Sequence, residues 1–406
     1  MKRILITVLL CFTGMTIFAQ DMSYYTREYM RQDGTFRDRL IVLENIRDAG
    51  ITGIGDFYQE ALKFLLLRAP DIRTRSEQEA AERSVIILSQ GIGAEKHTAA
   101  GLELWQAAEF FDVVRGSNEG NAMQSCLIAL GQIDAREFIP HIAQRLHDYN
   151  TQTFRNAETR RRYQTAVIGC INALETFKDI SGFNPVFFAS VGSYDPAVKQ
   201  IASDALPNIT EDPGEVISAI INETANNPMV KLEAWNQMLK SKAPDASKAK
   251  TAAVALATGW SYVTSDRAMQ ERLRDMRKSA IDTMRQFGIP DNSVYTNLER
   301  SYSSNFNNRA PDYDEIMLTL NTLAAVKSDE AVDLLLKFLR ELHGRRVSGP
   351  WGDRERQVFQ WVVSCLGVTG TSSQAVKMML TTIQRTADYT PFEQGLARNA
   401  LNSLGG

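Results

Sequence analysis

The chain has 406 residues, with 45 lysines and arginines against 48 acidic residues and a formal net charge of −3. A weakly acidic chain lacks the general attraction to nucleic acid that comes from neutralising phosphates, so no nucleic-acid partner is expected. The cysteines are few and widely spaced, which excludes a disulfide framework and a cysteine zinc site.

The N-terminal residues have the pattern of a secretory signal. Basic residues at 2 and 3 precede an apolar run over residues 4–18, and Ala19 stands in a suitable cleavage neighbourhood. The run of about fifteen residues is shorter than the roughly twenty that a membrane span needs. We therefore predict a signal peptide over residues 1–19 and an exported, periplasmic chain with no span after cleavage. A retained N-terminal anchor is the alternative.

Helical patterns follow almost without interruption. The third predicted helix opens on a capping box, Ser76 to Glu79, and ends before Gly91, which is interpreted as a helix stop. The helix over residues 265–287 carries both charge signs and is predicted to be solvated. In chain order, helices are predicted over residues 35–48, 57–68, 76–88, 102–114, 121–131, 134–147, 212–239, 265–287, 328–342, 357–366, 374–385 and 388–404.

The clearest unit lies over residues 121–147. Gly131 is interpreted as the point where the backbone leaves the first helix, and Asp134 with Glu137 as the cap of the second. Such a helix pair is too small to bury its apolar face alone, so it needs a neighbour of the same kind. The apolar positions, spaced i, i+3, i+4 and i+7 on one helix face, are Met123, Cys126, Leu127 and Leu130, followed by Phe138, Ile139, Ile142 and Leu146.

Similar phrases recur along the chain: CLIALG from Cys126, CINALE from Cys170, ASDALP from Ala202, VSCLGV from Val363 and ARNALNSLG from Ala397. Their spacing brackets the roughly 30–47-residue units of helical solenoids. Small residues in these phrases let helices of successive units approach closely.

These phrases, with the proline early in FIPHIAQRL, resemble the HEAT and armadillo-like repeat families, above all the short bacterial HEAT-like type. The resemblance implies an all-α fold, a right-handed α-solenoid of stacked antiparallel helix pairs. Glu175 and Pro207 depart from the family by replacing the glycine that Gly131 provides in the first phrase. The domain prediction is a repeat region over 20–288, an irregular loop or hinge over 289–314, and a second repeat region over 315–406.

The sequence lacks the common motifs of catalytic and nucleotide-binding sites. The sequence contains no H-E-x-x-H, G-x-S-x-G or P-loop pattern. His141 and His147 fall on different helix faces, so no metal site is predicted there. Cys126, Cys170 and Cys365 are interpreted as small core residues, with a Cys126–Cys170 bridge left open. We therefore expect a non-enzyme with no catalytic, cofactor-binding or metal-binding residues.

Two basic stretches are the candidates for binding a partner. Arg345, Arg346, Trp351 and Arg354 lie in a predicted loop over residues 343–354, and Arg and Trp are enriched at binding hot spots. Arg160 and Arg161 could bind an acidic partner. An ordinary inter-repeat loop and a solvated helix start are the alternative interpretations.

Solenoids expose an extended concave face that commonly binds partners. The expected function is therefore an exported, non-enzymatic protein-binding scaffold. The alternatives are a structural component of a large cell-envelope assembly, such as a motor or secretion apparatus, and a HEAT-like enzyme subunit of the lyase type.

Overall fold

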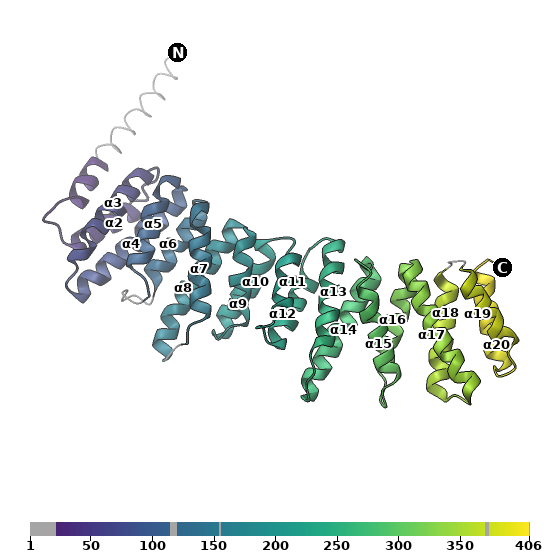
Figure 1. The fold of residues 1–406 in the computed structure, drawn as a ribbon. Helices are drawn as coiled ribbons and strands as arrows, with labels where there is room; N and C mark the ends of the chain where they lie inside the picture. The colour runs from purple at the N-terminus through teal and green to yellow at the C-terminus, as the bar shows by residue number, and fades with distance from the viewer. Residues whose placement is uncertain (1–21, 114–119, 154–155, 370–372, 406) are drawn as a thin grey trace, which may run out of the picture. The chain divides into compact units, whose positions relative to one another are not determined.

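The computed structural model describes residues 22–113, 120–153, 156–369 and 373–405. The predicted signal peptide lies outside these residues. Within them the chain is helical and contains no β-strand, as Figure 1 shows. No helix of this part of the chain is long and apolar enough to cross a membrane.

The chain divides into two compact units, Met1–Glu211 and Asp212–Gly406. After helical residues 22–29, the first unit contains α2 (Phe36–Asp48), α3 (Gly55–Arg68), α4 (Arg75–Glu95), α5 (Gly101–Phe110), α6 (Asn121–Gln132), α7 (Ile139–Asn150), α8 (Ala157–Phe177), α9 (Phe183–Val191) and α10 (Pro196–Ile209). The second contains α11 (Gly214–Asn222), α12 (Pro228–Lys240), α13 (Asp245–Ser261), α14 (Arg267–Phe287), α15 (Val294–Phe306), α16 (Tyr313–Val326), α17 (Asp329–Ser348), α18 (Asp353–Thr369), α19 (Gln374–Arg385) and α20 (Pro391–Ser403). Short 3₁₀ turns (Ala69–Asp71, Thr98–Ala100, Arg136–Phe138 and Ile180–Gly182) precede or follow helices of the first unit.

Helices two apart in the chain pack on one another within each unit. In the first unit α2, α4, α6, α8 and α10 form one row, here called the even row, with α3, α5, α7 and α9 beside it. In the second unit α12, α14, α16, α18 and α20 form one row, and α11, α13, α15, α17 and α19 the other. Alternation between two rows is the packing of an α-solenoid, which confirms the predicted fold class.

The unit at residues 121–147 forms the two predicted helices, and all eight predicted apolar positions are buried. The helices that these two pack against differ from the prediction. Instead of forming one hairpin, α6 packs mainly on α4, α5 and α8, while α7 packs on α8 and α9. The repeating pair is therefore α5 with α6, then α7 with α8.

The glycines predicted to end helices lie inside them. Gly91 and Gly93 belong to α4 and Gly131 to α6. A Cβ on Gly131 would lie 3.2 Å from the Cα of Ala173 on α8, and one on Gly91 would lie 2.5 Å from the Tyr58 ring. These glycines permit close approach between neighbouring helices, as expected for the recurring small residues, so the interpretation as helix stops is wrong.

Glycines with positive φ follow α2 and α14, at Gly50 and Gly288, whereas other helices end on larger residues in the left-handed region. Lys96, Asp134, Lys178 and Lys327 adopt positive φ between 53° and 57°, directly or shortly after α4, α6, α8 and α16. Asp134 therefore occupies the left-handed position after α6 and does not cap α7, contrary to the prediction. The capping box of α4 also lies elsewhere, at Thr74 and Glu77.

Two stretches predicted to be irregular are helical. Residues 289–314 contain α15, whose buried face carries Val294, Leu298, Tyr302 and Phe306 at spacings of four residues. The Asn and Ser residues between these positions, including the buried Ser301 and Asn305, hide this stripe in the sequence. The unit boundary falls at Glu211, not in this segment. Likewise α17 extends to Ser348, so the loop predicted from His343 is only a short connection before α18.

The cysteines give the first testable prediction. Cys126, Cys170 and Cys365 are free and buried, and burial raises the pKa of the first two thiols to about 12. At mildly alkaline pH the native protein should leave Cys126 and Cys170 unmodified by iodoacetamide, because reaction requires an accessible thiolate. Peptide mass spectrometry with and without urea measures this; labelling of either cysteine without urea, or a Cys126–Cys170 disulfide, would contradict the structure.

Candidate partner-binding surface

Trp351, the centre of the predicted hot spot, is a core residue. It is only 8% exposed and its ring lies 5.0 Å from that of Phe359 and 5.7 Å from that of Tyr389. The His343 ring stacks on that of Tyr389, with Nδ1 3.0 Å from the Tyr389 hydroxyl. The cluster joins α17 and α18 to the α19–α20 connection, so Trp351 is not available as an exposed anchor.

Arg354 binds main-chain carbonyls of its own chain. Its guanidinium donates to the carbonyl oxygens of Phe306 at 3.2 Å, Asn308 at 2.6 Å and Arg309 at 3.1 Å. Carbonyls at the end of a helix lack intrahelical partners, and here the cation satisfies those that follow α15. Arg354 therefore has a structural role at this position.

Arg345 and Arg346 are also engaged within the second unit. Arg345 donates to Asn307 and to Glu341, each at 2.8 Å. Arg346 donates to the carbonyl of Asp388, and its guanidinium carbon lies 5.5 Å from the centre of the Trp351 ring. These contacts, together with those of Arg354, link neighbouring helices of the second unit to one another.

Arg160 and Arg161 belong to the first unit, at the start of α8. Arg160 lies 4.0 Å from the Asp195 carboxylate, and both arginines are exposed. Arg345, Arg346 and Arg354 belong to the second unit. Their role in binding stays a prediction.

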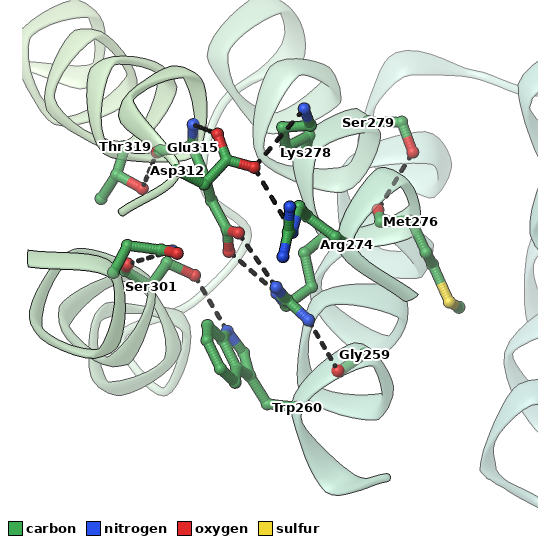
Figure 2. A network of polar contacts seen from close by, with 12 residues as sticks. Gly259, Trp260, Arg274, Met276, Lys278, Ser279, Ser301, Asp312, Glu315 and Thr319 are labelled. Carbon is green, nitrogen blue, oxygen red and sulfur yellow. Dashed lines mark hydrogen bonds and ion pairs between the residues drawn. The ribbon is translucent and has the colours of Figure 1, made fainter. Parts of the chain in front are cut away.

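A buried ion pair lies within a network of polar contacts in the second unit (Figure 2). Arg277 on α14 donates to both carboxylate oxygens of Glu315 on α16, at 2.8 and 3.0 Å, and to the carbonyl of Gly259 at 3.2 Å. The Trp260 ring lies 3.9 Å from the guanidinium carbon, and its Nε1 donates to Ser301. All partners belong to this chain, so the network cross-links α13, α14, α15 and α16.

The polar network continues toward the surface. Asp312, which caps α16, accepts from the backbone of Glu315 and lies 3.5 Å from Arg274 and 3.6 Å from Lys278, as Figure 2 shows. Helix α14, which was predicted to be solvated, therefore packs one edge of its charged face against the start of α16. This is a structural cross-link between α14 and α16.

A groove is present between α4 and α6 of the even row. It has a volume of about 300 Å³ and is lined by Gln90 and Ala94 from α4 and by Ser125, Ile128 and Gln132 from α6. Beneath it, the hydroxyls of Ser89 and Ser125 lie 2.7 Å apart and join the two helices. The lining contains alkyl, amide and hydroxyl groups and no side chain that is charged near neutral pH.

Gly93 on α4 leaves the space that the Gln132 side chain occupies at this groove. A Cβ at that position would lie 1.9 Å from Oε1 of Gln132, so the amide of Gln132 rests where a larger residue on α4 would project. The same Cβ would be 3.4 Å from the Cα of Ala129, an ordinary contact. The prediction from sequence missed the groove, although Ile128 lies off the predicted apolar face of its helix and could have signalled it.

No protein-family model matches the chain, and no curated protein matches its sequence. Among the described residues, no group of three or more His, Cys, Asp and Glu side chains is placed to hold a metal ion. One similar solved structure is a circular tandem repeat protein with novel repeat topology and enhanced subunit contact surfaces. It shares 15% identity over 91% of this chain and 81% of its own, with a TM-score of 0.19.

The class of the protein follows from its own packing. Alternating helices in two rows, with left-handed residues recurring after α4, α6 and α8 of the even row, define a helical repeat protein. The finer assignment to the HEAT or armadillo-like type stays a prediction from the recurring phrases.

Proposed function

We propose that this protein is an exported, non-enzymatic scaffold of the HEAT-like type that binds a protein partner on the even row of its first unit. The groove between α4 and α6 is the observation that carries the proposal. Stacked helices provide a preformed surface, which lowers the conformational cost of binding. A groove on such a surface can take a side chain of a partner.

The character of the lining supports binding over catalysis. Gln90 and Gln132 each offer an amide donor and acceptor, and Ala94 and Ile128 offer alkyl surface. Neither kind of group transfers protons or attacks a substrate near neutral pH. Ser125 adds a hydroxyl, which lies 2.7 Å from that of Ser89, and the lining contains no His, Asp, Glu or Lys that could activate it as a base. Export is proposed from the basic, apolar and cleavage-site pattern of residues 1–19.

Site-specific photo-crosslinking tests the proposed function. Benzoylphenylalanine at Gln90, in cells producing the full chain, is expected to give a discrete crosslinked species in the periplasmic fraction. The control position is Lys63, an exposed residue of α3 in the other row. Equal crosslinking from both positions, or no crosslinked species from Gln90, would contradict the proposal.

A further inference from the structure

We propose that the groove between α4 and α6 selects an uncharged aliphatic side chain, such as leucine, from an extended segment of the partner. This inference rests on the proposed function and specifies the chemistry of the same surface. It depends on the size of the groove, its uncharged walls and the placement of two amides at its rim.

Size restricts the occupant. The volume of about 300 Å³ is at the small end of the roughly 300–1,000 Å³ range of pockets that hold small ligands. It suits one side chain with its adjoining peptide groups and is too small for a helix. Ala94 and Ile128, which come from facing helices, supply the alkyl contact that an aliphatic side chain can bury.

Charge restricts the occupant further. A charged side chain entering the groove would meet no opposite charge in its walls, so it would gain no ion pair there, whereas an aliphatic side chain can bury alkyl surface. The acid next to Ala94 in the sequence is Glu95, and its carboxylate accepts from the backbone of Ile54, at the start of α3. The groove therefore complements a neutral occupant.

The rim suits a peptide backbone. Gln90 and Gln132 are exposed, one on each helix, and each amide can donate and accept at once. A peptide group has the same paired capacity, so two amides can bind the main chain while the side chain enters the groove. Gly93 keeps the Gln132 amide in its observed position by leaving space on α4.

The test uses capped amino acids as probes of the full-length protein. Saturation-transfer difference NMR is recorded with N-acetyl-leucine N-methylamide and with the corresponding glutamate and lysine compounds. The leucine probe is expected to give saturable signals, and the charged probes signals that do not saturate over the same range. Equal behaviour of the three probes, or no saturable binding of the leucine probe, would overturn the inference.

Two variants connect binding to the groove. Gly93→Ala displaces the Gln132 amide and should abolish saturable binding, while Ile128→Ala removes alkyl contact and should weaken it roughly fivefold. Gly344→Ala is the matched control, because no atom lies within 4 Å of its added Cβ. Circular dichroism checks that each variant keeps its helices.

Unchanged binding in both groove variants would refute the assigned location. If Gln90 still crosslinks a partner specifically while the leucine probe fails, the proposed function stands and the aliphatic specificity is wrong. If the leucine probe binds and depends on Gly93 and Ile128 but no crosslinked partner forms, the specificity stands and the scaffold function fails.

Discussion

Replacing Glu315 by alanine is expected to lower the free energy of unfolding of the second unit by about 3–5 kcal/mol. The side chain of Glu315 is fully buried and that of Arg277 is 11% exposed. Removing the carboxylate leaves the guanidinium with the Gly259 carbonyl as its hydrogen-bond acceptor and a ring face at Trp260. Urea unfolding followed by circular dichroism measures the loss, without adding the screening ions of guanidinium chloride.

Two comparisons show whether the buried charge is the cause. Glu271→Ala breaks an exposed pair with Arg267 on the same helix, and should cost less than about 1 kcal/mol. The double variant Arg277→Met with Glu315→Leu removes both charges and should recover most of the stability that Glu315→Ala loses. A loss for Glu315→Ala no larger than that for Glu271→Ala would show that this ion pair does not stabilise the fold.

Local periodicity explains why much of the fold was predictable. Met123, Cys126, Leu127 and Leu130 mark a buried stripe that depends only on helix geometry, and all four are buried. The helix predicted over residues 328–342 also begins where its sequence indicates, since the Ser328 hydroxyl caps α17 by accepting from the backbone of Ala331 three residues on. Such features need no knowledge of the neighbouring helix.

The features that failed depend on distant residues. Gly131 taken alone suggests a helix end. In the structure a glycine is needed there because the backbone of Ala173 on the neighbouring α8 leaves little room for a side chain. Arg354 and Trp351 suggested an exposed hot spot, but Trp351 is buried and Arg354 is half-buried and donates to carbonyls at the end of α15. In each case the local pattern indicated what kind of contact the residue can make. It could not indicate which distant residue of the chain makes that contact.

The ion pair and the groove left weaker signals in the sequence. Arg277 lies on the helix face of Leu273, Ile281 and Met284, which are buried, so a charge interrupts an apolar stripe. That interruption predicts a buried partner but does not identify Glu315, 38 residues further on. Ile128 similarly marks apolar surface outside the core stripe of α6 without showing which helix faces it.

Close packing within the even row gives the other large expected effect. A Cβ on Gly169 of α8 would lie 2.9 Å from the Cα of Gln124 on α6, and 3.2 Å from Cδ1 of Leu127. A Cα cannot move aside as a flexible side chain can, so a larger residue must separate the two helices. That separation would also disturb the packing around buried Cys126.

Gly169→Leu should therefore lower the free energy of unfolding of the first unit by about 1–2 kcal/mol, because an overpacking cost of about 3 kcal/mol outweighs the roughly 1 kcal/mol gained in helix propensity. Gly344→Leu makes the same change on α17, where the added Cβ meets no atom within 4 Å, so there only the gain in propensity should remain. Urea unfolding of both variants should give shifts of opposite sign. If Gly169→Leu stabilises the protein as Gly344→Leu does, α6 and α8 do not approach as closely as the structure shows, and the recurring small residues need another explanation.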